Sequence, residues 1–289
     1  MVMSKRQKTL RVGDFELSRE VLAQAYAGKI IRAVYVPRGT PLAVKMVSLN
    51  EPVKKEAFDN EARISHICSL NENAIRVHKV FRQETHGFIS MSLFDMTLND
   101  LILDRRRLSG RRSTSIFRQI ILGVAFMHER NIAHLNLSPV NILIVSRDQT
   151  AFVSDFGNSF LLETEQKIGE GLFQLGTRGE EGFQAPEVLI PGSFYNPVSA
   201  DVWSLGVILL CMMTGFFFTT ATVAAELAAI EGLNPQCREL VGRMVAIDPK
   251  RRPALRDVLE HPFMLQYLEA PRTPRSSITR LRDMIGSRR

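Results

Sequence analysis

The chain has 289 residues, of which 45% are hydrophobic and 23% are charged, and it contains three cysteines. This composition is that of a globular protein with one large domain or two lobes around a cleft. It excludes a fully disordered chain, a collagen-like repeat and a small disulfide scaffold. The formal net charge is +7, but residues 1–11 and 271–289 carry an excess of nine positive charges, which leaves residues 12–270 at −2.

The two ends are therefore expected to be basic segments: an N-terminal arm at 1–14 and a C-terminal tail at 265–289. Such segments can contact acidic surfaces, and because the body of the chain is near neutral, nucleic acid is not the expected partner. Cys68, Cys211 and Cys237 lie far apart without a CxxC pair, and no secretory leader pattern opens the chain. A cytoplasmic or nuclear location is the expectation, and the protein partner or substrate is not specified.

The first hundred residues are rich in β-forming runs, and helical patterns dominate from residue 98 onward. The predicted elements, in chain order, are a hairpin at 30–47, a helix at 54–70, strands at 77–81 and 87–93, helices at 98–106 and 113–129, and an apolar helix at 202–218. Within the first helix, Ala57, Ile64 and Cys68 are predicted to share the core face. The apolar helix is at the lower length limit for a bilayer, and we predict a buried core helix and no membrane span.

Four short strings carry chemistry. Each recurs by chance, but their order and spacing are specific, and two further strings follow them. They are Ala43-Val44-Lys45, His134-Leu135-Asn136-Leu137-Ser138-Pro139-Val140-Asn141, Asp155-Phe156-Gly157 and Ala185-Pro186-Glu187, followed by Asp201–Gly206 and Asp248–Pro253. On these residues the chain resembles the eukaryotic protein kinase family from about Phe15 to Phe263, with Pro139 and Asn141 typical of the Ser/Thr branch.

The resemblance implies a bilobal α+β fold over residues 15–264. A small β-rich N-lobe with one main helix is expected at about 15–93, and a larger α-helical C-lobe at about 95–264. It also implies a site for ATP and Mg²⁺, because phosphoryl transfer needs a cation on the nucleotide phosphates and oxygen ligands for the metal.

By resemblance, Lys45 would hold the α- and β-phosphates, and Glu61 would pair with it, with Glu56 on the same predicted helix as the alternative. Asp155 would bind the bridging Mg²⁺ and Asn141 a second metal ion. The remaining nucleotide-site residues that the resemblance implies are Ala23, Ala25, Gly28, Ile30, Ala43, Met91, Leu93, Phe94 and Leu143. Met91 would be the gatekeeper, and the segment 92–94 the hinge that receives adenine through backbone groups.

Other positions depart from the family pattern. In the glycine-rich loop, Gly28 stands at the third glycine, but Ala23 and Ala25 replace the first two, which predicts weakened ATP binding. In the catalytic loop, Asn136 stands where the family has the Asp that accepts the substrate proton, and an amide is not a base at neutral pH. Ser138 replaces a phosphate-contacting Lys, and Leu135 replaces an Arg that receives a phosphate from the activation segment.

The segment before Ala185 also departs from the family pattern in the preferred alignment. The family has a Gly-Thr pair there, whose Thr bonds the catalytic Asp and Lys. The preferred alignment, without insertion, places Gly179 and Glu180 at this pair, and the alternative places Gly176 and Thr177 there. The residues that hold the fold together are, in contrast, those of the family: Glu187, Arg252, Asp201, His134 and Phe156.

We therefore predict a pseudokinase, a kinase fold that binds ATP and Mg²⁺ weakly, is catalytically impaired, and serves as a regulator or scaffold. One alternative is a weakly active or unorthodox Ser/Thr kinase, with Glu180 as a substitute base. The other is a nucleotide-free interaction module. The site itself leaves open whether the chain is an enzyme.

Overall fold

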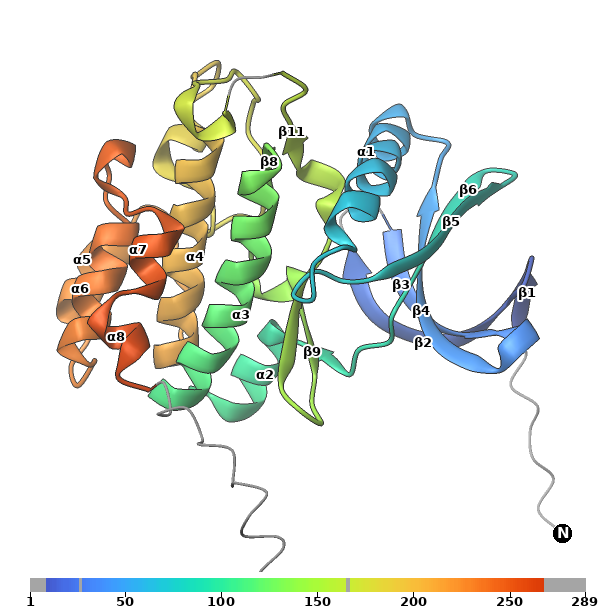
Figure 1. Ribbon diagram of the computed structural model, residues 1–289, viewed down its shortest axis with the longest axis horizontal. Coiled ribbons are helices and arrows are strands. Elements are labelled where there is room, and N and C mark those ends of the chain that lie inside the picture. The colour runs from blue at the N-terminus through green and yellow to red at the C-terminus, as the bar shows by residue number, and fades with distance from the viewer. Residues whose placement is uncertain (1–8, 26–27, 165–166, 268–289) are drawn as a thin grey trace, which may run out of the picture.

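A six-stranded antiparallel sheet forms most of the N-terminal part of the protein (Figure 1). The computed structural model describes residues 9–25, 28–164 and 167–267. The strands are β1 (Leu10–Val12), β2 (Phe15–Ala25), β3 (Gly28–Tyr35), β4 (Thr40–Ser48), β5 (Val77–Gln83) and β6 (His86–Met91), in the spatial order β1-β2-β3-β4-β6-β5. Apolar and β-branched residues alternate along these strands, as strands with one buried face require.

Strand β4 lies in the middle of this sheet, which places its residue Lys45 between Ile30 of β3 and Ile89 of β6. Part of the expected N-terminal arm at residues 1–14 belongs to the sheet, as the edge strand β1. Leu10–Val12 pair with β2, and Val12 is buried with Phe15 against the sheet. Residues 1–8 of that arm lie outside the described residues.

One long helix, α1 (Pro52–Cys68), packs against the sheet. Proline suits the first turn of a helix, where its missing N–H is not needed. The core face was predicted with Ala57, but Phe58 occupies the core and Ala57 is only half-buried. Gly87 of β6 makes this possible, because a Cβ atom there would lie 2.5 Å from the Phe58 ring. The face of α1 with Glu61 therefore lies against the sheet.

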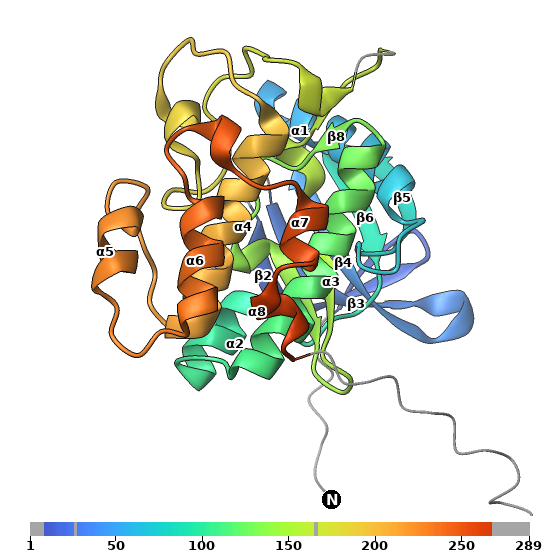
Figure 2. The same cartoon turned by 60° about the vertical axis from the view of Figure 1, so that its left-hand side comes forward.

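The C-terminal part is mainly helical, and its helices surround the central helix α4 (Figure 2). Its helices are α2 (Leu98–Arg105), α3 (Gly110–Glu129), α4 (Pro197–Thr214), α5 (Val223–Ala229), α6 (Pro235–Met244), α7 (Leu255–Leu259) and α8 (Pro262–Leu265). Helix α3 begins three residues earlier than predicted, because the Ser109 side chain caps its first turn. By length and composition α4 is apolar enough to cross a membrane, but 78% of it is buried inside the protein, as a core helix is.

Short strands between the two parts hold the segments of interest. They are β7 (Met96–Thr97), β8 (Ile132–Ala133), β9 (Ile142–Val145), β10 (Thr150–Val153) and β11 (Phe160–Leu161). The loop 134–141 runs from β8 to β9, and Asp155 is the second residue after β10. The predicted bilobal α+β fold is confirmed: a small sheet with one main helix, joined to a larger helical lobe.

Candidate nucleotide and catalytic site

Lys45 lies at the centre of a buried group of charges. Its Nζ donates to Glu61 Oε2 and to Asp155 Oδ1, each at 2.6 Å, and only 2% of the Lys45 side chain is exposed. This geometry decides between the two glutamates of α1, because Glu56 is exposed. Strand β4, helix α1 and the segment after β10 thus bring together three residues that are 16 and 110 positions apart.

Burial and neighbouring charge shift the pKa values of this group in different directions. Burial alone would lower the pKa of Lys45, but the two carboxylates outweigh it and raise that pKa above its usual value. The pKa of Asp155 stays below its usual value, since Lys45 outweighs the opposing effect of burial. Burial raises the pKa of Glu61 to about 7, against the attraction of Lys45. The pair Lys45–Asp155 is therefore the fully charged one.

The turn at Asp155 is held by α1. Asp155 has a left-handed backbone, with φ of 63°, and the following Phe156–Asn158 form a 3-10 turn. Asn60 Nδ2 donates to the carbonyl oxygens of Phe156, Gly157 and Ser159 at 3.5, 3.2 and 2.7 Å. Asn60, which precedes Glu61, was missed in the sequence. No sequence signal indicated this contact, because neighbouring residues of a helix point about 100° apart.

The catalytic loop is anchored by Asp201 of α4. This carboxylate is fully buried and accepts from the backbone N–H groups of His134 and Leu135, both at 2.8 Å, and from His128 Nε2 at 2.8 Å. The His134 ring packs on Phe156 with 5.7 Å between ring centroids. Burial lowers the pKa of His134. The backbone of the loop is thus fixed to helix α4 by charge-assisted hydrogen bonds.

Two amide side chains of this loop, those of Asn136 and Asn141, form hydrogen bonds within the site. Asn136 Nδ2 donates to Asp155 Oδ2 at 3.5 Å, and Asn141 Nδ2 donates to the carbonyl oxygen of Asn136 at 2.7 Å. Because the Nδ2 atom of Asn141 is engaged in this hydrogen bond, Oδ1 is the atom of this side chain that would bind a metal ion. The predicted base position and both predicted metal ligands therefore line one cavity of about 370 Å³.

The side chain of Ser138, unlike those of Asn136 and Asn141, lies away from this cavity. Its side chain is fully buried, and its Oγ has no hydrogen-bond partner among the described residues. It does not line the cavity that contains Asn136 and Asp155. A serine at this position therefore cannot touch a phosphate in the cleft.

The glycine-rich loop is described only at its two sides, since Tyr26 and Ala27 lie outside the described residues. Ala23 pairs with Ile30 and Ala25 with Gly28 across strands β2 and β3. A Cβ atom at Gly28 would lie 2.1 Å from the carbonyl oxygen of Met46 on β4. This glycine is therefore needed for strand packing. Ala25 lines the cavity with Asn136.

The predicted adenine walls are apolar and buried. Ile30, Ala43, Met91 and Leu143 belong to one hydrophobic cluster and are each at most 7% exposed. Leu93 is half-buried, and the side chain of Phe94 is in the core, so only its backbone remains for a ligand. In the hinge, Ser92 N already donates to the carbonyl oxygen of Arg76 at 3.0 Å.

The segment before Ala185 follows the alignment without insertion. A Cβ atom at Gly179, whose φ is 93°, would lie 2.7 Å from the carbonyl oxygen of Leu135, so this glycine allows the close approach to the catalytic loop. Glu180 is exposed on the wall of the same cavity. Thr177, the alternative residue, donates through Oγ1 to the carbonyl oxygen of Val188 at 3.3 Å.

A buried ion pair holds this segment to the helical lobe. Arg252 donates from Nη1 and Nη2 to the two carboxylate oxygens of Glu187 at 2.6 and 2.8 Å, and only 1% of its side chain is exposed. Arg252 also donates to the carbonyl oxygens of Ala246 and Ser199, and its guanidinium lies 5.1 Å from the centre of the Trp203 ring. All three guanidinium nitrogens of Arg252 therefore have hydrogen-bond partners.

The residues at the cleft fit ATP with Mg²⁺. Magnesium takes oxygen ligands and is usually held by one or two side chains together with substrate phosphates. Asp155 and Asn141 offer these oxygens at the cavity, and Lys45 offers a cation beside them. A phosphate that binds Lys45 has to compete with Asp155 for the ammonium group.

A curled sheet with one helix, a helical lobe, and a Lys–Glu pair facing an Asp after β10 define a protein kinase domain. A model of the protein kinase domain family matches residues 18–264. The chain therefore belongs to the eukaryotic protein kinase family. Protein kinase domains generally bind ATP and Mg²⁺.

Serine/threonine kinases are among its relatives. The chain is 28% identical over 280 residues to the serine/threonine protein kinase OSK3 of Oryza sativa subsp. indica, covering 91% of this chain and 51% of that protein. It is 26% identical over 269 residues to the protein kinase domain-containing protein ppk9 of Schizosaccharomyces pombe, covering 89% and 49%. It is 28% identical over 271 residues to the serine/threonine-protein kinase GIN4 of Saccharomyces cerevisiae, covering 88% and 23%. The chain thus spans about half of these relatives' length or less.

Proposed function

We propose that this kinase domain binds ATP and Mg²⁺, transfers phosphate poorly or not at all, and acts as a regulator or scaffold. The observation that carries the proposal is the Asn136 amide at the base position, 3.5 Å from Asp155. An amide holds the place of a carboxylate, but it cannot accept the proton of a substrate hydroxyl at neutral pH.

The catalytic loop supplies neither of the two groups that speed up transfer. Without a positioned base the rate falls by about 10²–10⁴. The buried Ser138 brings no charge to the cavity, and an absent electrostatic stabiliser costs a further factor of about 10²–10³. The nucleotide side supports binding, because Lys45, Glu61 and Asp155 are assembled.

A weakly active Ser/Thr kinase is the second candidate. It is favoured by Glu180, an exposed carboxylate that lines the same cavity as Asn136. A carboxylate there would accept the substrate proton in place of Asn136. Since positioning contributes much of the rate in phosphoryl transfer, the remaining groups would sustain slow turnover.

Nucleotide binding is tested by thermal unfolding of the full chain with Mg²⁺, with ATP, and with both. We expect a rise in Tm that needs both ligands and is absent in Asp155→Ala. No rise at millimolar ATP would contradict the proposal and leave a nucleotide-free interaction module.

Catalysis is tested by phosphate incorporation into a generic basic protein. We expect little transfer by wild type, and a rise in Asn136→Asp that is larger in Asn136→Asp with Ser138→Lys. Wild-type transfer at the rate of an ordinary kinase would contradict the proposal. Slow transfer that is lost in Glu180→Gln, but not in Glu181→Gln, would favour the second candidate.

A further inference from the structure

The cavity between the lobes lacks a cation from the catalytic loop, because Ser138 is buried away from it. A cation from another segment nevertheless lines it. Arg178, on the segment after the Asp155 turn, lines the same cavity as Asn136, Asn141 and Asp155. The family motif begins one residue later, at Gly179, and therefore does not include Arg178.

Arg178 is fixed at both its side chain and its backbone. Its Nε donates to the carbonyl oxygen of Leu175 and its Nη1 to that of Asn158, both at 3.0 Å. The Gln184 amide donates to its backbone carbonyl oxygen at 3.1 Å. The next residue, Gly179, lies against the catalytic loop at Leu135. The guanidinium is therefore held against the Asp155 turn at Asn158, and the backbone that carries it lies against the catalytic loop.

The anchors of Arg178 do not neutralise it. Both side-chain partners are neutral carbonyl oxygens, and no ion pair to Arg178 exists within the described residues. Its Nη2 forms no hydrogen bond with any described residue. In contrast, Lys45 has two carboxylates and Arg252 has one in bidentate contact. Arg178 is thus a positioned cation with unused donors at the cavity wall.

We propose that Arg178 contacts the terminal phosphate of ATP and so makes the domain distinguish ATP from ADP. The inference rests on the proposed nucleotide binding. Lys45 is buried behind its contact with Asp155, whereas Arg178 lines the cavity together with Asn136, the position beside which the transferred phosphate of a kinase lies. A guanidinium with free donors suits a phosphate, because its planar fork gives short, charge-assisted hydrogen bonds.

The test is the ratio of ATP to ADP affinity, both with Mg²⁺, measured by calorimetry on the full chain. Wild type is expected to bind ATP about tenfold more tightly than ADP or better, the effect of one charge-assisted hydrogen bond. Arg178→Ala is expected to bring this ratio close to one while ADP affinity stays the same. Arg178→Lys, which keeps the charge but not the fork, is expected to give an intermediate ratio.

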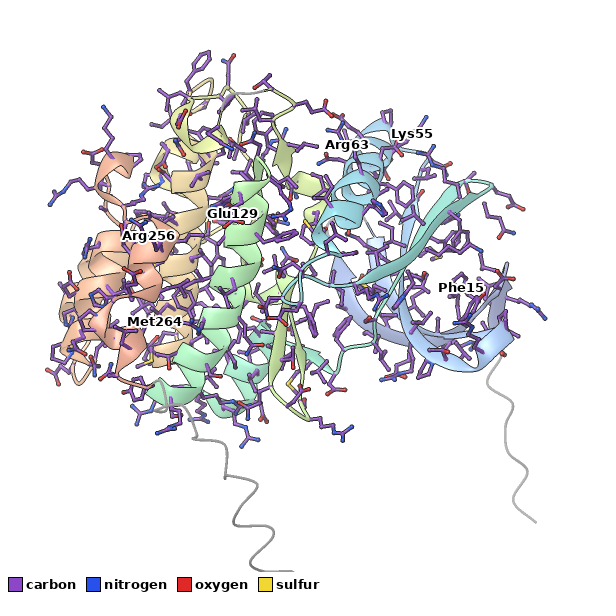
Figure 3. The ribbon with its side chains drawn as sticks, viewed as in Figure 1. Phe15, Lys55, Arg63, Glu129, Arg256 and Met264 are labelled. Atoms are coloured by element: carbon purple, nitrogen blue, oxygen red, sulfur yellow. The ribbon has the colours of Figure 1, made fainter. Side chains whose placement is uncertain are left out.

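The matched control is Arg256→Ala. Arg256 lies on α7, on the far side of the helical lobe from the sheet, and 82% of its side chain is exposed (Figure 3). Arg256→Ala removes the same charge as Arg178→Ala and is expected to leave the ratio of ATP to ADP affinity unchanged. Unchanged ADP affinity in Arg178→Ala also shows that the variant is folded.

The possible outcomes separate the two proposals. A preference for ATP that persists in Arg178→Ala, or equal affinity of wild type for both nucleotides, would overturn the role of Arg178 and leave nucleotide binding intact. Equal loss of ATP and ADP affinity in Arg178→Ala would assign the residue a purely structural role and also overturn the inference. Failure of wild type to bind either nucleotide would overturn the proposed function, and the inference with it.

Discussion

The two sides of the cleft differ in what they retain. On the nucleotide side, Lys45 donates hydrogen bonds of 2.6 Å to both Glu61 and Asp155. On the catalytic-loop side, the backbone is anchored by Asp201, but the side chains Asn136 and Ser138 carry no charge. The residue that anchors the backbone of this loop is therefore a different residue from those at the predicted catalytic positions.

The contrast extends to energetics. Groups that hold the fold are buried and fully paired, so their loss leaves an unpaired charge or donor in the interior. Residues of the cavity wall, such as Ala25, Asn136 and Glu180, contribute no buried charge, so substitution there leaves no such defect. Variants of the first kind are expected to reduce stability strongly, and variants of the second kind to change binding or its pH dependence with little loss of stability.

The largest effect is expected for Glu187→Ala. It leaves the Arg252 guanidinium buried without its carboxylate, and loss of one partner of a buried pair lowers the free energy of unfolding by about 3–5 kcal/mol. Urea unfolding measures the change. Glu20→Ala is the control, because its pair with Arg32 is exposed and contributes at most about 1 kcal/mol. Similar losses in both variants would remove the distinction between framework and surface.

Asp201→Asn is expected to have the next largest effect. The buried carboxylate accepts from three donors, including the backbone of His134 and Leu135, whereas an amide has only one oxygen. We expect a loss of about 1–3 kcal/mol for the donor left unpaired. Hydrogen exchange of the His134 and Leu135 amides should also become faster. Unchanged exchange would mean that Asp201 is not the anchor of the loop.

A pH effect is expected from Glu61. Burial raises its pKa from 4.5 to about 7, so in this window the folded protein holds a proton that the unfolded chain has released. The contribution of Glu61 therefore makes the protein less stable as the pH rises from about 5 to 7. Glu61→Gln removes this titration, and its Tm should decline less over that range than that of wild type.

The exposed Glu56→Gln on the same helix is the control for this pH effect, and it should follow wild type. Identical slopes for wild type and Glu61→Gln would show that Glu61 does not titrate in this window.

The smallest change in stability is expected at the glycine-rich loop. Ala25→Gly restores a family glycine at the cavity, and its greater freedom in the unfolded chain costs about 0.5–1 kcal/mol. ATP affinity should rise, because the backbone can then approach the phosphates more closely. Thermal unfolding and calorimetry measure the two changes. No gain in affinity would mean that the alanines do not limit nucleotide binding.

Much of the fold was predictable from local patterns. The hairpin at 30–47, the helix that contains Glu61 and the apolar helix α4 follow from strand, turn and helix signals. The strand at Leu10–Val12 was missed, because basic residues surround it and its stability comes from pairing with β2. The place of Ala57 was also wrong, since both Ala57 and Phe58 suit a helix and only the contact of Phe58 with Gly87 decides which one is in the core.

For the site, the sequence by itself determined the family and the residue types, because motif order and spacing record short-range geometry such as a turn after β10. It also placed Asn136 at the position that the family resemblance assigns to the catalytic base. Only the tertiary structure decided that Glu61, not Glu56, pairs with Lys45 and that Ser138 is buried. It also decided that Asn60 holds the turn after Asp155 and that Arg178 lines the cleft. These contacts join segments up to 110 residues apart, and their partners are chosen by packing of whole elements, which no local pattern encodes.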